Sequence, residues 1–496
     1  MISYPHFLQL VMPEVIVVIT AIFVLTADLL LRTSPLRSRL AIAAGLASTG
    51  CAAAILSLVL STERVNIFDG MFVGNPLTHV VQIALLVLTI LILLLAVDST
   101  FTEHVGEFVL LVLFATTGMM FLVASQNLLS SFIALELLSL PLYILTGFDK
   151  RSPRSSEAAL KYFLFGGMSA AFLLLGFSLL YGFSNSLNFI QIAAAIHGAS
   201  PNNGLNPLLI VAIVTTVIGL GFKVTAVPLH FWAPDAYEAA PIPVAAFIAS
   251  GSKVASFFVF FQILALAFAG AEGSVAWMHV IHGWVPIVAA VAALSMLLGN
   301  MAAIVQTSLR RLLAYSAIAH AGYMLIGIVA HTQQSLASLL YYVITYAFAT
   351  IGAFGVIGVV EESTGSDRLA NFNGLSKRSP ILAACLLIFL LSLAGIPPLA
   401  GFFGKFYLFV AALAASPGLL WLVVLAIGMS AVSLYYYLRV LKRVYGDASE
   451  SASDSIPASS FSTAVIALLA AGVVLFGCAP NLLLQWILDA IHSVSA

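Results

Sequence analysis

Runs of about 20 apolar residues recur from one end of the chain to the other, separated by short segments that hold most of the charged residues. A helix rises 1.5 Å per residue, so each run is long enough to cross the ~30 Å hydrocarbon core of a bilayer. The runs lack the alternation of a transmembrane β-barrel, and a helix satisfies its own backbone groups in lipid. The pattern therefore predicts an all-α, polytopic membrane protein.

We predict about fourteen membrane-spanning helices, counted from these runs. They lie at residues 8–31, 37–60, 76–97, 106–124, 127–147, 157–182, 206–229, 241–269, 284–306, 311–330, 335–359, 380–412, 418–440 and 461–490. The first run is too long for the apolar part of a signal peptide and lacks a basic segment before it, so we expect it to be retained. The twelfth is too long for one straight helix, and its sequence AGIPPLAGFFGK (394–405) should interrupt it.

The composition agrees with a membrane protein. The chain of 496 residues is 62% hydrophobic and 8% charged, whereas about a quarter of the residues of a soluble domain are charged. The three cysteines, Cys51, Cys385 and Cys478, are isolated, so an iron–sulfur cluster or a disulfide framework is not expected. The net charge of −1 does not indicate a nucleic-acid partner.

The positive charges predict how the helices are oriented. The odd-numbered connections between helices hold 14 of the 19 Lys and Arg residues, and the even-numbered ones hold only Arg64. The residues of the odd connections are Arg32, Arg37, Arg39, Lys150, Arg151, Arg154, Arg310, Arg311, Arg368, Lys377, Arg378, Arg439, Lys442 and Arg443. Because positive charges favour the cytoplasmic side, we expect the odd connections in the cytoplasm and both termini on the outer side.

The four remaining basic residues, Lys161, Lys223, Lys253 and Lys405, lie inside predicted helices, and Glu136 lies near the middle of the helix at 127–147. A charged residue at the centre of a membrane helix costs roughly 2.5–3.5 kcal/mol on insertion scales. Such residues usually pair with one another or line a water-filled path. A buried lysine can release its proton at moderate pH, because an apolar environment disfavours its charged form.

Two interpretations of these residues remain open. Glu136 could pair with a lysine only to lock two helices together, or the buried charges could carry protons. Several such groups in one bundle favour a proton or ion path. Lys161 is the weakest member, because it lies about one turn into its helix, after an expected cap at 155–157, and its long side chain can reach the membrane surface.

Glycine and proline interrupt the helices that carry Lys223 and Lys405. Paired interruptions of this kind, one in each half of the chain, indicate a transport site, although a packing kink is the alternative. The interrupted helices are each fourth in a block of five, which predicts two inverted repeats. We therefore divide the chain into a three-helix segment at 1–105, a first repeat at 106–270 and a second repeat at 271–445. The rest, 446–496, is a cytoplasmic linker followed by the last helix.

Histidines add further candidates. His320 lies in the middle of the helix at 311–330 and could relay protons between Lys253 and Lys405, because histidine titrates near neutral pH; a satisfied core histidine is the alternative. His230, Asp235 and Glu238 cluster at the expected cytoplasmic end of the helix at 206–229. They favour a proton entrance or a loop contact over a metal site.

Five long motifs resemble subunit N of bacterial NADH-quinone oxidoreductase, respiratory complex I. They are GEFVLLVLFATTGMMFLVASQNLLSSFIALELLSLPLYILTGF (106–148), KYFLFGGMSAAFLLLGFSLLYG (161–182), PLHFWAPDAYEAAPIPVAAFIASGSKVA (228–255), RRLLAYSAIAHAGYMLIG (310–327) and AGIPPLAGFFGKFYLF (394–409). The resemblance implies an antiporter-like subunit of the bacterial inner membrane, with two inverted repeats and a buried proton route. Its partners would be other membrane subunits of the complex, including neighbouring antiporter-like subunits, and the lipid bilayer.

The resemblance also implies roles for the buried residues. Glu136 would pair with Lys223 until a charge change in a neighbouring subunit weakens the pair. A proton would then pass through Lys253, and through His320, to Lys405. Lys161 matches a lysine of the family as well. The chain itself would bind no cofactor, because NADH, FMN, the iron–sulfur clusters and the quinone belong to partner subunits of this translocase.

Other functions fit parts of the pattern. A cation/proton antiporter subunit of the Mrp type shares the fold and the lysines, although the run SLPLYILTGF (139–148) and Lys405 favour complex I. A membrane scaffold whose buried charges only hold helices together belongs to a different class. A complex of the same architecture with another electron donor would look the same in this chain.

Overall fold

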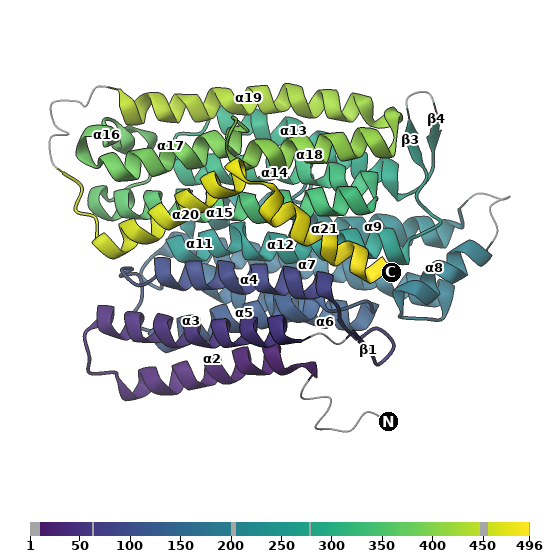
Figure 1. The fold of residues 1–496 in the computed structure, drawn as a ribbon, viewed down its shortest axis with the longest axis horizontal. Helices are drawn as coiled ribbons and strands as arrows, with labels where there is room; N and C mark the ends of the chain where they lie inside the picture. The colour runs from purple at the N-terminus through teal and green to yellow at the C-terminus, as the bar shows by residue number, and fades with distance from the viewer. Residues whose placement is uncertain (1–9, 62–63, 200–204, 277–278, 447–454, 496) are drawn as a thin grey trace.

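The computed structural model describes residues 10–61, 64–199, 205–276, 279–446 and 455–495. This part of the chain is almost entirely helical, and the long helices lie side by side with their axes running in one general direction (Figure 1). The two small hairpins of antiparallel strands are β1 (Val65–Ile67) with β2 (Phe72–Gly74) and β3 (Ser274–Ala276) with β4 (His279–Ile281). They lie at the same end of the bundle as the C-terminus, which we call the hairpin end (Figure 1). The predicted all-α class is confirmed.

Twelve helices of the described residues are long and apolar enough to cross a membrane, and the seventh and twelfth predicted spans occur as shorter pieces. The first half of the chain forms α2 (Met12–Leu30), α3 (Leu36–Leu60), α4 (Pro76–Leu95), α5 (Val105–Val123), α6 (Leu128–Thr146), α7 (Pro153–Ser184), α8 (Phe189–Gly198), α9 (Pro207–Lys223), α10 (Trp232–Ala239), α11 (Ile242–Ala249), α12 (Gly251–Gln262) and the π-helix η2 (Ile263–Ala267). The second half forms α13 (Trp284–Ile304), α14 (Leu309–Ala330), α15 (Gln333–Thr364), η3 (Leu369–Phe372), α16 (Leu375–Arg378), α17 (Pro380–Ala394), α18 (Ala400–Ala415), η4 (Pro417–Leu419), α19 (Leu420–Tyr445), α20 (Ser460–Cys478) and α21 (Asn481–Ser495).

The expected interruptions are present. The seventh span stops at Lys223, the last residue of α9, and the twelfth stops between Ala394 and Ala400, where α17 gives way to α18. In the second case Gly395 adopts a φ of +88°, a left-handed conformation that ends a helix and favours glycine. Both interruptions leave backbone carbonyl groups without their helical partners inside the bundle.

Two local predictions are wrong, and a third, the span at 241–269, is confirmed as Ile242–Ala267 but contains an interruption. The expected single helix at 461–490 consists of α20 and α21, because Pro480 lacks the backbone N–H that a continuous helix needs. The expected helix at 241–269 is interrupted at Ser250, whose dihedrals are not helical and whose hydroxyl donates to the carbonyl oxygen of Ala246 at 2.6 Å. The cap expected at 155–157 is provided instead by Ser152, which accepts from the N–H of Ser155.

Two five-helix blocks share local features. The third helix of each block, α7 and α15, has 32 residues. The N-cap residue of the second helix forms an isolated β-bridge with the segment that follows the third, Asn127 with Asn188 and Ser308 with Arg368. The expected linker at 446–460 lies mostly outside the described residues.

The most deeply buried helices are α12, α14 and α15. All residues of α12 are buried, and nearly all of α14. By contrast, α2, α3, α7 and α19 keep broad outward faces with exposed apolar side chains, as expected where a membrane protein meets lipid or another subunit. Lys253 of α12 and His320 of α14 therefore lie in the centre of the bundle, where a charge has to find its partner within the protein.

Candidate functional site

Glu136 and Lys223 lie together, as the sequence predicts. The Nζ atom of Lys223 is 3.9 Å from Oε1 of Glu136, and it donates hydrogen bonds to Ser139 Oγ at 2.5 Å and Tyr143 OH at 3.4 Å. All three partners come from α6, whereas Lys223 ends α9. The lysine side chain is 6% exposed and the glutamate side chain 28%. The ammonium group of Lys223 is therefore buried inside the bundle, whereas the carboxylate of Glu136 is partly exposed at its surface.

The outward face of α6 surrounds Glu136 with apolar side chains. Leu129, Ile133, Leu140 and Ile144 lie on that face at helical spacing and are all exposed. A carboxylate in such a stripe is unfavourable against lipid, because hydrocarbon offers it no hydrogen bond. This face is therefore suited to contact with another polypeptide rather than with lipid alone.

Lys253 connects the interruption of the seventh span to α14. Its Nζ atom donates to Thr225 Oγ1 at 3.0 Å and to the carbonyl oxygen of Ala317 at 3.1 Å, and the side chain is fully buried. Thr225 lies two residues after Lys223, in the irregular segment that follows α9. The interruption at Lys223 thus provides the hydroxyl that binds the next lysine.

His320 lies between two tyrosine hydroxyls in the centre of the bundle. Its Nδ1 atom is 2.7 Å from Tyr342 OH, and its Nε2 atom is 3.3 Å from Tyr437 OH. The ring of Tyr346 lies between His320 and Lys253, with centroids 5.0 Å apart on the histidine side and the ring centroid 5.6 Å from Nζ on the lysine side. Both ring nitrogens of His320 therefore have a hydrogen-bond partner that can donate or accept.

Lys405 is held by the interruption of the twelfth span. Its Nζ atom donates to the carbonyl oxygens of Leu393 and Ala394, both at 3.1 Å, and to Ser430 Oγ at 2.8 Å. These carbonyls are free to accept because α17 ends at Ala394. The ring centroid of Tyr323 lies 5.0 Å from Lys405 Nζ and 5.6 Å from the ring of His320. Tyr323 thus separates the histidine from the last lysine.

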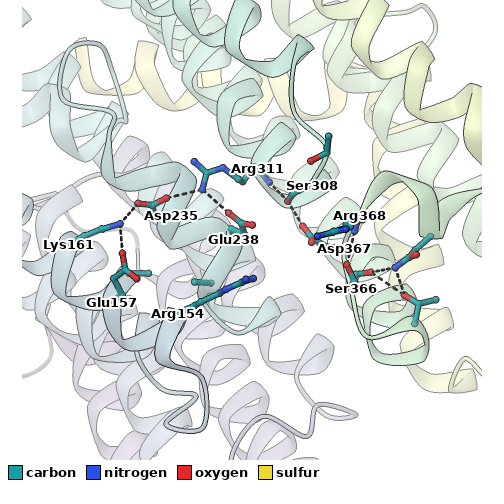
Figure 2. A pocket seen from close by; sticks show the side chains of 15 residues that line it. Arg154, Glu157, Lys161, Asp235, Glu238, Ser308, Arg311, Ser366, Asp367 and Arg368 are labelled. Carbon is teal, nitrogen blue, oxygen red and sulfur yellow. Dashed lines mark hydrogen bonds and ion pairs between the residues drawn. The ribbon is translucent and has the colours of Figure 1, made fainter.

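Lys161 lies apart from this line, in a polar cleft of about 760 Å³ (Figure 2). Its Nζ atom is 2.7 Å from a carboxylate oxygen of Glu157 and 2.9 Å from one of Asp235. Arg311 continues the network, with ion pairs to Asp235 at 2.9 Å and to Glu238 at 2.7 Å. Figure 2 shows these side chains as one chain of alternating charges that joins α7, α10 and α14. Lys161 is 42% exposed, in agreement with its expected position near the membrane surface.

The structure separates His230 from the two acids with which it clusters in the sequence. Its ring lies against Phe231, with centroids 4.4 Å apart, and His230 does not line the cleft that contains Asp235 and Glu238. Within the described ranges, no three His, Cys, Asp or Glu side chains are placed to hold a metal ion. The geometry around Asp235 and Glu238 is that of a contact between segments, with Arg311 as the shared partner.

Sequence reasoning missed several polar partners. Ser139, Ser430, Tyr342 and Tyr437 bind the predicted lysines and histidine directly. Serine and tyrosine are common in apolar helices and carry no formal charge, so composition does not single them out. A helical spacing from a charged residue is the one signal available, as for Ser139, which lies one turn from Glu136 on the same helix.

Comparisons with known proteins place the chain in a family. Residues 125–430 match the family described as NADH:quinone oxidoreductase/Mrp antiporter, TM. The chain is 56% identical to NADH-quinone oxidoreductase subunit N 2 of Acidobacterium capsulatum, over 98% of this chain and 99% of that protein. The chain belongs to the subunit N family of NADH-quinone oxidoreductases. The resemblance inferred from the motifs is confirmed.

Solved structures of similar fold come from more than one kind of complex. A chain of respiratory complex I from Thermus thermophilus with bound aureothin superposes with a TM-score of 0.76 at 33% identity. The match covers 95% of the chain described here and 98% of the Thermus chain. A chain of the Mrp complex from Dietzia sp. DQ12-45-1b reaches a TM-score of 0.78 at 21% identity, over 96% and 97%. The likeness to the Mrp chain shows the fold alone, whereas sequence identity favours subunit N over the Mrp alternative.

Proposed function

We propose that this chain is a proton-translocating, non-redox membrane subunit of an NADH-quinone oxidoreductase, respiratory complex I. The observation that carries the proposal is the continuous line of buried groups through the bundle. Glu136 contacts Lys223, Lys253 reaches the segment after Lys223, and His320 lies between Lys253 and Lys405. A scaffold needs paired charges, but it does not need a row of buried lysines and a histidine from one half of the chain to the other.

The first step of the route depends on Glu136. At 3.9 Å, a carboxylate and an ammonium group attract each other by about 4 kcal/mol at an effective dielectric constant of 20. Glu136 therefore helps Lys223 to keep its proton. When a charge change next to Glu136 weakens this attraction, the proton of Lys223 can move on through hydroxyls and water towards Lys253.

The second half of the route uses groups that can both donate and accept. Lys253 and His320 both contact the Tyr346 ring, and His320 and Lys405 both contact the Tyr323 ring. These separations exceed hydrogen-bond length, so water molecules would complete the transfers. His320 can change which ring nitrogen carries the proton, with Tyr342 and Tyr437 as its hydrogen-bond partners.

Lys161 and the polar cleft supply the proposed entrance. The cleft lies between the two blocks, at the end of the bundle where the positive charges of the connections predict the cytoplasm. Lys161, Asp235 and Arg311 form a solvated network there, in which protons exchange readily with water. With this orientation both termini face the periplasm, and the chain spans the inner membrane of a bacterium.

The apolar face of α6 supplies the proposed contact with a neighbour. Glu136 reaches that face and needs a polar partner from outside the chain, which fits another membrane subunit of the complex, such as an antiporter-like one. Redox chemistry, with NADH, FMN, iron–sulfur clusters and quinone, is assigned to partner subunits. The boundaries 1–105, 106–270, 271–445 and 446–496 describe the proposed three-helix segment, the two inverted repeats and the C-terminal part.

The test is the replacement Glu136→Gln in the native host. Inverted membrane vesicles would be assayed for NADH-driven quinone reduction and proton uptake, with assembly followed on native gels. Glu103→Gln is the matched control, because Glu103 is 74% exposed and outside the line of buried groups. We expect an assembled complex with depressed turnover and proton uptake. Normal turnover and uptake would refute the proposal, failed assembly would favour the scaffold, and NADH oxidation independent of this chain would favour the Mrp-type antiporter.

A further inference from the structure

A buried carboxyl group without a charged partner lies in the three-helix segment, far along the chain from the lysines. Glu14 is in the first turn of α2 and is only 1% exposed. Its Oε1 atom accepts a hydrogen bond from Gln82 Nε2 at 2.7 Å, and the same nitrogen donates to the carbonyl oxygen of Met120 at 3.1 Å. Its Oε2 atom has no hydrogen-bond partner among the described residues. One oxygen of this carboxyl group therefore needs a partner that the described chain does not supply.

A small pocket lies beside Glu14. It has a volume of about 30 Å³, which is large enough to hold a water molecule. Its polar lining comes from three helices, with Glu14 on α2, Ser57 and Ser61 at the end of α3, and His79 and Gln82 on α4. A water molecule in this space would find several groups that donate or accept hydrogen bonds, which is the condition for a buried water.

The charge balance around the pocket favours a carboxyl group that carries a proton. An ionised carboxylate in a buried site costs several kcal/mol unless it is paired with a positive charge. The groups that donate to the Glu14 carboxyl are the neutral amide of Gln82 and its own backbone N–H, and neither carries a charge. Arg39 of the neighbouring helix lies near the other end of α3 and is bound to Asp28 at 2.7 Å. Arg64, which follows α3 at the hairpin end, is exposed and does not line the pocket. Among the residues that line the pocket, His79 is the one other titratable group.

We propose that this pocket holds a water molecule that exchanges a proton with Glu14, so that Glu14 and His79 form a proton-binding site separate from the path of Glu136 and the lysines. The pocket is also lined by Phe72, Val73 and Gly74 of β2, so it lies at the hairpin end. In the proposed orientation this is the periplasmic end. The inference rests on the pocket and the unpartnered oxygen, and it does not depend on the proposed function.

The experiment uses the intact complex from the native host, carrying wild-type subunit, Glu14→Gln or the control Glu103→Gln. Infrared difference spectra between neutral and alkaline pH, in H2O and in D2O, detect the carbonyl stretch of a protonated carboxyl group. We expect a band that shifts on deuterium exchange and falls reversibly at alkaline pH. It should be present in wild type and control and missing from Glu14→Gln. His79→Gln should shift the pH at which the band falls.

Two results would overturn the inference. A spectrum of Glu14→Gln that equals the wild-type spectrum would show that Glu14 exchanges no proton. A band that appears only when sodium is removed would show that the pocket holds a monovalent cation instead. If the complex with Glu14→Gln fails to assemble, Gln82→Met tests the same site. This replacement removes the amide that donates to Glu14, so it must shift the carbonyl band of Glu14, and an unshifted band would refute the site. None of these experiments measures proton pumping, so their outcome is independent of the Glu136→Gln test.

Discussion

Tyr342→Phe tests the position of His320 in the path most directly. The replacement removes one hydroxyl group, 2.7 Å from Nδ1 of a fully buried histidine, and leaves the aromatic ring in place. A buried polar group that loses its partner costs about 1–3 kcal/mol. Since 1.36 kcal/mol corresponds to a factor of ten, a step that needs the oriented imidazole should slow by about 5- to 150-fold. Tyr437 is 3.3 Å from Nε2 and also bonds to Ser316, so Tyr437→Phe should have the smaller effect.

The matched control is Tyr341→Phe. Tyr341 precedes Tyr342 on the same helix and is equally buried, but its hydroxyl donates to the carbonyl oxygen of Phe476 at 2.7 Å, on α20. The control removes the same atom from the same helix without touching His320. Proton uptake and quinone reduction driven by NADH would be measured in inverted vesicles for both variants. We expect Tyr341→Phe to retain coupled turnover and to lose about 1–3 kcal/mol of stability, because the carbonyl of Phe476 is left without this donor.

Similar behaviour of the two variants would contradict the proposed role of His320. Equal, normal turnover would mean that the hydroxyl of Tyr342 does not orient a proton carrier, and His320 would then be a satisfied core histidine. Equal losses, together with lower thermal stability of both complexes, would indicate a packing defect. Only a selective loss of turnover in Tyr342→Phe, with assembly intact on native gels, agrees with the proposed path.

Three further replacements test other parts of the structure. Arg310→Met removes a buried guanidinium that binds two backbone carbonyls and a half-buried carboxylate, so we expect about 3 kcal/mol of destabilisation, measured as earlier thermal dissociation of the subunit. Gly401→Ala places a Cβ against a carbonyl oxygen of the preceding half-helix and should lower proton uptake, whereas Gly428→Ala meets open space and should not. Burial alone would raise the pKa of Asp98, but hydrogen bonds from two serines and the charge of Arg37 hold it below its ordinary value of 3.8. The ionised Asp98 therefore contributes to stability above about pH 4, and this contribution is lost as the pH falls through the pKa of the folded state. Asp98→Asn should cost about 1 kcal/mol of stability at pH 7, and the thermal stability of the variant should change less than that of the wild type when the pH falls below about 4.

The buried charges and the interruptions could be predicted from the sequence because both stand out against an apolar background. A lysine in a run of leucine and alanine has few physical explanations, and glycine with proline has a known effect on a helix. For this reason Lys223, Lys253 and Lys405 and the two interruptions beside them were predicted together. The fold class follows from the same contrast, since the apolar runs are long and recur throughout.

The partners of these charges could not be predicted, because they depend on tertiary packing. Thr225 and the carbonyl oxygen of Ala317 meet Lys253 only when two distant segments pack together. The interruption at Ser250 could not be predicted either, because serine is tolerated within membrane helices and no glycine–proline pair marks the site. The sequence grouped His230 with Asp235 by proximity along the chain, but only Asp235 lines the polar cleft.

Equivalent positions in the two blocks carry different residues with different hydrogen-bond partners. Ser139 is twelve residues after the cap Asn127, and His320 is twelve residues after the cap Ser308. In the proposed repeat these are equivalent positions. In the first block the residue accepts a hydrogen bond from Lys223, and in the second it is a histidine with tyrosine hydroxyls on both sides.

The same comparison of equivalent positions shows that the two ends of the proposed path differ in the groups that hold their lysines. The position equivalent to Glu136 in the second block is Ala317, which offers only a backbone carbonyl, and the ammonium group of Lys405 is likewise held by carbonyl oxygens. A carboxylate can lose its charge or be drawn towards another partner, whereas a carbonyl dipole is fixed. In the proposed path, a signal from a neighbouring subunit can therefore act on the Glu136 end directly, and Lys405 would respond to charge that arrives through His320. This asymmetry favours Glu136 as the proposed switch and Lys405 as the proposed site of proton release.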